Sequence, residues 1–381
     1  MNFELSSEHK LIFESTLGFA REHFAPLVEK MEKEDEWPEE IWAMAARQGL
    51  LGAWVPEEYG GSGGDFTSAV MILQAIFRVS SAIGLSVGAH LNLCVHNIMR
   101  NGTEEQKMKY LPKLVKGEWV GAMGLTEPDH GSDAMGIQTK AVRKGDHYVL
   151  NGSKIFITNG PIADVIVVYA RTKQDAGSRG LSAFIVETTT PGFNVSKKLK
   201  KTGHLGSPTG ELFFEDMVVP AENLLGEENN GFRIIMKGLD IERAVLTCAG
   251  VALIEESLEL SLKYAQERKQ FGQPIAGFQL IQAKLADMYT SLTNSRLALY
   301  NVCSLIEQGK RASLESAAAC LYSAESAVRA ADESVQIHGG YGYIKDFPVE
   351  RIWRDSKLLE IGGGTKEIRR ILIAAELLGL R

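Results

Sequence analysis

The sequence predicts an α+β protein in which a β-rich middle section lies between two helical sections. Two observations support this prediction. Apolar residues recur at helical spacing at both ends of the 381-residue chain, whereas short runs rich in Val, Ile and Phe fill its middle. A chain of this length exceeds one small core, so we expect several domains. We place them at residues 1–120, 121–230 and 231–381.

The composition is ordinary for a soluble globular protein and excludes several classes. Hydrophobic residues make up 45% of the chain, and a net charge of −7 argues against a nucleic-acid partner. The 4 cysteines are far apart and show no metal-ligand spacing, so we expect a reduced intracellular protein without a metal site. The N-terminus lacks an apolar signal region, and no apolar run approaches membrane-spanning length. We therefore expect a cytoplasmic location and no membrane insertion.

The first section reads as helices around one glycine-rich loop. Helical patterns cover residues 7–33, 39–50 and 66–100, and Pro38 suits the first turn of the second helix. Residues 56–64 are rich in glycine and cannot hold regular structure cheaply, so they form a loop.

The middle section reads as short strands separated by turns. Turn pairs such as Asn151-Gly152 and Pro191-Gly192 punctuate the β-rich runs. Regular short strands with such punctuation predict a β-sandwich or barrel. The predicted strands are residues 148–150, 155–157, 165–169, 183–186 and 212–214.

The last section reads as a bundle of about four helices. No proline interrupts residues 231–268, so one long helix is possible there. Further helical patterns cover residues 278–307, 314–337 and 366–379. Glycine clusters separate the last of these from the others.

The long helix carries one glutamate on an otherwise apolar stripe. The stripe follows spacings of three and four and consists of Ile235, Leu239, Glu242, Leu246, Ala249 and Leu253. A buried carboxylate either finds a cation or changes its pKa. Glu242 is therefore either a general base or the partner of a cation on a neighbouring element, and the spacing leaves both interpretations open.

Residues 124–133 offer hydroxyls, carboxylates and flexible backbone at the junction of the first two sections. Loops that bind ligands have this composition, and so do ordinary turns. No Rossmann, P-loop or metal-binding motif occurs elsewhere.

The order of the sections, together with several motifs, resembles the acyl-CoA dehydrogenase family over nearly the whole chain. The motifs lie at residues 124–128, 156–160, 267–272, 336–340 and 364–365. This resemblance implies the acyl-CoA dehydrogenase fold, a homotetramer and FAD. It also implies α,β-dehydrogenation of an acyl-CoA to the 2-enoyl-CoA, with electron-transferring flavoprotein as the electron acceptor.

The resemblance also implies where the base lies. Most members carry it as a glutamate two residues before the threonine of the final Gly-Thr motif, and here that position is Gly363. Isovaleryl-CoA and long-chain acyl-CoA dehydrogenases carry it on the long helix, in a motif similar to residues 239–243. We therefore assign Glu242 as the base and the Gly363 backbone N–H as a donor to the thioester oxygen. Isovaleryl-CoA dehydrogenase-like members look closest.

Family position implies the remaining binding residues. FAD contacts in the middle section are Met123, Leu125, Thr126, Gly131, Ser132, Phe156, Ile157 and Thr158. Further contacts to the same FAD are Gln336, Ile337, Gly339, Gly340, Thr365 and Glu367. Residues on the cofactor of a neighbouring subunit are Arg268, Phe278 and Gln279, with Phe271 beside them. Acyl-CoA contacts are Ser132, Leu91, Leu93, Cys94, Asp240, Arg243, Gly362 and Gly364. For Arg243 the alternative is a salt bridge to Asp240 on the same helical face.

The expected substrate is a short branched or cyclic acyl-CoA. Gly362 and Gly363 replace the bulky pair of straight-chain enzymes, which leaves lateral room beside the thioester. The pattern His204-Leu205 followed by residues 207–209 differs from the isovaleryl pattern, so an alicyclic or aryl-substituted acyl-CoA stays open. A flavin oxidase or monooxygenase, or a non-catalytic relative on the same fold, also stays open.

Overall fold

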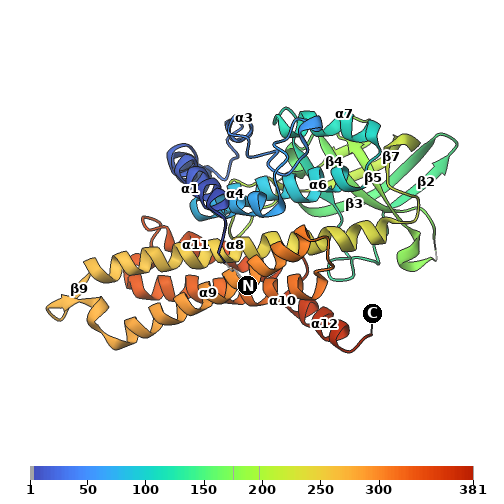
Figure 1. The fold of residues 1–381 in the computed structure, drawn as a ribbon. Helices are drawn as coiled ribbons and strands as arrows, with labels where there is room; N and C mark the ends of the chain where they lie inside the picture. The colour runs from blue at the N-terminus through green and yellow to red at the C-terminus, as the bar shows by residue number, and fades with distance from the viewer. Residues whose placement is uncertain (1–3, 175, 197, 381) are drawn as a thin grey trace.

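A computed structural model of the chain describes residues 4–174, 176–196 and 198–380. Helix α8 (Gly231–Glu267) crosses the whole molecule (Figure 1). The N-terminal helices and the sheet lie on one side of it, and α9 (Gln279–Glu307) and α10 (Ser313–His338) lie on the other. The first two predicted sections therefore lie on one side of α8, and α9 and α10 of the third section lie on the other.

The first section is helical, as predicted, but the helix predicted over residues 66–100 is interrupted. The helices are α1 (Ser7–Phe19), α2 (Ala25–Glu34), α3 (Glu40–Arg47), α4 (Phe66–Val79), α5 (Ser81–Gly88), α6 (His96–Asn101) and α7 (Glu104–Val115). The continuous helix expected over residues 66–100 was wrong, because Ser80 adopts an extended conformation between α4 and α5. Its side chain accepts the backbone N–H of Ile83 at 3.3 Å and so caps α5.

One helical stretch of the described chain, Ser81–Asn101, is long and apolar enough to cross a membrane by length and composition. The expectation that no run reaches this length was therefore wrong. The stretch is 83% buried inside the fold, and Ile83 and Val87 on it belong to the main hydrophobic core. Burial of this kind is typical of a core helix, whose apolar surface is covered by the protein itself.

The middle section forms one mixed sheet folded upon itself. Its strands are β1 (Gly121–Gly124), β2 (Lys140–Lys144), β3 (His147–Thr158), β4 (Val165–Arg171), β5 (Leu181–Glu187), β6 (Phe193–Val195), β7 (Thr209–Pro220) and β8 (Leu224–Leu225). The strand order is β6-β7-β3-β2-β4-β5-β8, and β1 pairs with β4 in parallel. The half with β3 and β7 packs against the half with β4 and β5, for example through the rings of Tyr148 and Phe184 at 4.9 Å. The predicted sandwich or barrel is thereby confirmed.

The turn predicted at Asn151-Gly152 was wrong. Both residues lie inside β3, where the register with β7 shifts between Leu150 and Gly152. Gly152 has φ +148° there, and a Cβ added to it would lie 2.6 Å from Thr139 Oγ1. The pair therefore makes an irregularity in one long strand, which glycine permits because no side chain is present.

The last section is the predicted helical bundle. A short hairpin of β9 (Lys269–Gln270) and β10 (Gln273–Pro274) joins α8 to α9, and α11 (Val349–Ser356) and α12 (Lys366–Leu377) complete the section. The predicted long helices are confirmed to within a few residues. Small side chains let α10 approach α8 closely, as in the hydrogen bond between Ser261 and Ser334 at 2.9 Å.

Candidate active site

Glu242 lies at a narrow cleft between α8, the sheet and the end of the first section. The residues that line this catalytic cleft are Leu93, Asn97, Met123, Leu125, Tyr169, Ile235, Gly238, Leu239 and Glu242. Most of these residues are apolar. Within the described part of the chain, Glu242 makes no hydrogen bond and no ion pair, so the cation partner that the sequence left open is not observed there.

The electrostatics of Glu242 suit a base. Burial raises its carboxyl pKa above the usual value, and the positive charges of Arg243 and Arg369 offset only part of this effect. Arg243 is itself engaged with Asp240, whose Oδ1 lies 3.3 Å from Arg243 Nη1. This is the salt bridge that the sequence offered as an alternative role for Arg243. Because Arg243 is committed to Asp240, Glu242 keeps its basicity.

Gly363 faces Glu242 although 121 positions (363 − 242) separate them in the sequence. It lies in the turn before α12, whose N-terminus is capped by Thr365. A Cβ added to Gly363 would lie 3.6 Å from the carboxyl carbon of Glu242 and 2.5 Å from Leu246 Cδ1, and its φ of +63° favours glycine. The Gly363 N–H has no hydrogen-bond partner among the described residues. The structure thus brings the two predicted catalytic positions together.

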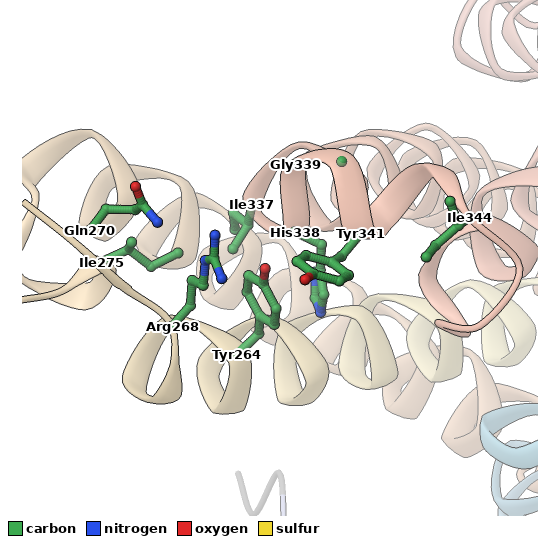
Figure 2. Close-up of a pocket in the computed structure, with 10 residues that line it drawn as sticks. Tyr264, Arg268, Gln270, Ile275, Ile337, His338, Gly339, Tyr341 and Ile344 are labelled. Atoms are coloured by element: carbon green, nitrogen blue, oxygen red, sulfur yellow. The ribbon is translucent and has the colours of Figure 1, made fainter.

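A second pocket lies at the opposite end of α8, beside the hairpin (Figure 2). This far pocket has a volume of about 510 Å³, and its lining residues are Tyr264, Arg268, Gln270, Ile275, Ile337, His338, Gly339, Gly340, Tyr341 and Ile344. Arg268 follows Glu242 by 26 positions (268 − 242), which is about 39 Å along a helix. No described atom lies within 4 Å of a Cβ added to Gly339 or Gly340, so bare backbone faces open space.

This arrangement corrects one grouping made from the sequence. Gln336, Gly339 and Gly340 were expected on the same cofactor as the middle section. The structure places them at the far end with Arg268, because α10 runs beside α8 and ends where His338 stacks on Tyr264 at 4.2 Å. In one chain they are too far from the catalytic cleft to share a ligand with it.

The 124–133 loop is held in place by a buried ion pair. Lys154, which is 0% exposed, donates from Nζ to the Leu125 carbonyl at 3.1 Å and to Glu127 at 2.8 Å. Glu127 also accepts the backbone N–H groups of Gln138 and Thr139. Burial lowers the pKa of Lys154 to about 8, and Glu127 opposes that effect. This lysine was not predicted, although a lysine within an apolar strand is unusual and indicates a buried partner.

Comparison with known proteins identifies the family. Three family models match: "Acyl-CoA dehydrogenase, N-terminal domain" at residues 6–118, "middle domain" at 122–217 and "C-terminal domain" at 229–378. The chain belongs to the acyl-CoA dehydrogenase family. Its members are FAD-dependent oxidoreductases that act on CH–CH groups.

Individual relatives agree over the full length. The mitochondrial isovaleryl-CoA dehydrogenase of Pongo abelii is 47% identical over 373 residues, which are 97% of this chain and 88% of that protein. The solved butyryl-CoA dehydrogenase of Megasphaera elsdenii is 38% identical, with a TM-score of 0.97 over 99% of this chain and 100% of that one. A solved FAD complex of PigA is 34% identical, with a TM-score of 0.96 and full coverage of both chains.

The residues expected to hold FAD fit such a group at both ends of α8. In the middle section Phe156 is 66% exposed at φ +61°, an apolar ring left uncovered at the end of β3 near Thr158. Met123 and Leu125 line the catalytic cleft. At the far end, bare backbone and aromatic rings surround the far pocket. The first place suits a flat apolar ring system, and the second suits a polar group held by backbone amides.

The other predicted residues are distributed unevenly. Ile157 is buried in the sheet core, and Thr126 and Thr365 are partly buried. The exposed members of the set are Gly131, Ser132, Phe271, Gln279, Gln336 and Glu367. Among the predicted tunnel residues Leu93 lines the catalytic cleft, whereas Leu91 and Cys94 are packed in hydrophobic cores at 1% and 0% exposure. A helix presents only one face to the cleft, which explains the difference.

Two further groups near Glu242 were not predicted. Tyr169 on β4 lines the catalytic cleft, and its buried hydroxyl has no hydrogen-bond partner in the described chain. Burial raises the pKa of this phenol, and the Glu242 charge adds to the effect. Arg369 on α12 is completely buried. Neither could have been found without the fold, because each lies far from Glu242 in sequence.

Proposed function

We propose that this chain dehydrogenates a short branched or cyclic acyl-CoA to its 2-enoyl-CoA and passes the electrons to an electron-transferring flavoprotein. The observation that carries the proposal is the carboxylate of Glu242, which lines an apolar cleft without a partner among the described residues and lies next to the turn at Gly363. A base and a hydrogen-bond donor on opposite sides of one small space are what removal of a thioester α-proton requires.

The chain's own residues account for the proton step. The α-hydrogen of a thioester is weakly acidic, because the resulting enolate-like charge must be stabilised on the thioester oxygen. Gly363 N–H can donate to that oxygen while Glu242 removes the α-proton. Burial strengthens Glu242 as a base by raising its pKa. The leucines and Met123 around the catalytic cleft exclude water. FAD, when bound, accepts the β-hydrogen as a hydride.

The shape and polarity of the cleft support the substrate class. A Cβ added to Gly362 would meet only Leu358, with its carbonyl oxygen at 3.5 Å, so the turn next to Glu242 has room beside its bare backbone. None of the residues that line the cleft is cationic, which disfavours a dicarboxylic acyl-CoA. Similarity to an enzyme named isovaleryl-CoA dehydrogenase favours a branched acyl chain.

Assembly as a homotetramer is part of the proposal. The catalytic cleft and the far pocket are too far apart in one chain to hold one FAD, so copies must combine to complete the cofactor site. Large apolar side chains near the hairpin support such contacts, since Phe271 is 92% and Leu280 80% exposed. Sedimentation equilibrium of the FAD-loaded protein would return four subunits; a monomer that keeps FAD would contradict this part.

The test of the function is flavin bleaching by a panel of acyl-CoAs without oxygen. We expect isovaleryl-CoA and a cyclic acyl-CoA to reduce the flavin faster than butyryl-CoA. Gly362→Tyr should remove this preference, since overpacking beside the ligand costs roughly 1–3 kcal/mol. No bleaching by any acyl-CoA would disprove the proposed reaction. Reoxidation by air as fast as by electron-transferring flavoprotein would indicate an oxidase instead.

A further inference from the structure

Arg369 is a buried cation without an acidic partner. It is 0% exposed, and no carboxylate of the described chain lies within ion-pairing distance of it. Its guanidinium instead donates to backbone carbonyls: Nη1 to Leu359 at 2.9 Å and to Cys320 at 3.5 Å, and Nη2 to Gly362. A buried charge is costly unless it is satisfied, so its place in this turn calls for an explanation.

The bond to the Gly362 carbonyl acts on the neighbouring amide. The Gly362 C=O and the Gly363 N–H belong to one planar peptide, which is trans in this structure. In a trans peptide the two groups point in opposite directions. Because Arg369 holds the carbonyl on the α12 side, the N–H is directed away from α12. A charged donor on the carbonyl also polarises the amide and makes its N–H a stronger donor.

The other charged groups around this turn are otherwise engaged. Glu360 pairs with Lys357 and Lys366, the latter at 3.0 Å. Arg243 pairs with Asp240. From β4 and α10, Tyr169 and Cys320 face Glu242, and burial raises the pKa of both groups, so they are uncharged at neutral pH. Arg369 is therefore the cation that bonds directly to the peptide preceding Gly363.

We propose that Arg369 is a positioning residue that orients and polarises the Gly363 amide as the donor to the thioester oxygen. The inference rests on the proposed function, because it assigns a purpose to a peptide of that site. It distinguishes Arg369 from a purely structural arginine, which would support the fold without affecting the charge on a bound thioester.

The test uses acetoacetyl-CoA, a 3-ketoacyl thioester whose acidic α-hydrogen ionises without any hydride transfer. The FAD-loaded protein is titrated with pH, and the bound enolate is followed by its ultraviolet absorbance. In Arg369→Lys a compact ammonium replaces the planar guanidinium and cannot reproduce its geometry toward the three carbonyls. The midpoint of ligand ionisation should therefore rise by about one pH unit, equivalent to a tenfold weaker donor. Turnover of the preferred acyl-CoA should fall about tenfold with little change in KM.

Arg78→Lys is the matched control. Arg78 is also buried, but it pairs with Glu256 at 2.8 Å between α4 and α8, away from the cleft. We expect it to lower stability without moving the ionisation midpoint. In Arg369→Ala, added methylguanidinium should restore part of the lost turnover, because it can occupy the vacated space.

The outcomes separate the two proposals. If wild-type protein is neither bleached by acyl-CoAs nor able to ionise acetoacetyl-CoA, the proposed function fails. If wild type does both and Arg369→Lys ionises the ligand within 0.2 pH units of wild type (a difference of less than about twofold), the role of Arg369 is overturned. Equal shifts in Arg369→Lys and Arg78→Lys would also overturn it, since the effect would then be general destabilisation.

Discussion

The two ends of α8 differ in what they offer a ligand. At the catalytic cleft, apolar side chains surround Glu242, whose carboxylate has no partner among the described residues, and the Gly363 turn lies next to it. At the far pocket, bare glycine backbone, an arginine and aromatic rings face about 510 Å³ of open space. The first environment changes the reactivity of the groups within it, because low polarity strengthens both base and donor. The second can hold a polar molecule without altering it. Under the proposed function, chemistry and cofactor retention would therefore be separated along one helix.

The largest expected effect comes from removing the base at the catalytic cleft. Glu242→Gln keeps the shape of the side chain but cannot accept a proton. Flavin reduction by acyl-CoA should fall by at least about 100-fold, which is the low end of what a positioned base contributes. Anaerobic stopped-flow absorbance measures this rate. The variant should remain yellow, because the far end of α8 is untouched, and full activity would contradict the assignment of Glu242.

Moving the carboxylate from Glu242 to position 363 tests whether the two residues act on the same space. A Cβ added to Gly363 would lie 3.6 Å from the Glu242 carboxyl carbon, so a glutamate there would approach the same space. Two obstacles are visible: the φ of +63° and Leu246 Cδ1 at 2.5 Å. Removing the second should help, because a leucine methyl can be deleted without touching the backbone.

We therefore expect the variant Glu242→Ala, Gly363→Glu, Leu246→Ala to reduce flavin at least about tenfold faster than Glu242→Ala, a fraction of the range for a positioned base. The control is Glu242→Ala with Leu246→Ala, which lacks any carboxylate in the cleft. A rate no higher than this control would show that the two positions do not share one reacting carbon.

Much of the fold could be predicted from the sequence, because it depends on local patterns. The spacing of the apolar stripe predicted α8 and placed Glu242 on its buried face. The break at Ser80 was missed, since a serine between apolar residues gives no strong local signal and its cap exists only once α5 has formed.

The individual residues of the site were predicted, but their positions relative to one another were not. Glu242 and Gly363 were assigned through family position, and only the fold, in which α12 packs on α10 and the turn before α12 reaches α8, brings them together. Arg369 could not be recognised, because its partners are backbone carbonyls, which leave no signal in the sequence. The position of Gln336 and the two glycines near Arg268 could not be predicted for a similar reason, because sequence motifs carry no information on how α10 lies beside α8.

A substitution in the far pocket should have a smaller effect, and it should change FAD retention and not the rate of flavin reduction. Arg268→Ala removes a cation from the far pocket, where its guanidinium lies 5.6 Å from the Tyr341 ring centroid. We expect FAD to dissociate about tenfold more readily, as for loss of one hydrogen bond to a charged group. Dialysis followed by flavin absorbance measures retention. Once reloaded with excess FAD, the variant should be reduced at nearly the wild-type rate; a large loss of that rate would mean that the two ends of α8 are not separate in function.

The smallest effect concerns the stability that the protein loses by burying the Glu242 carboxylate. Burial raises the pKa of Glu242 above its usual 4.5. As pH rises through about 4.5, the unfolded chain releases this proton while the folded chain keeps it. Folding therefore loses about 1.4 kcal/mol for each unit by which the folded pKa is raised, and the loss is complete once pH exceeds the folded pKa. Below about pH 4 both states are protonated and the cost disappears.

Glu242→Gln cannot ionise and should escape this cost, so it should be more stable than wild type at pH 7 and equally stable at pH 4. Denaturant unfolding at both values measures the difference, and Arg268→Ala, altered at the far end, should show no gain that depends on pH. A glutamine variant less stable than wild type at pH 7 would mean that Glu242 is paired with a cation in solution. The apolar cleft would then be an ordinary buried ion pair, and the contrast between the two ends of α8 would lose its chemical meaning.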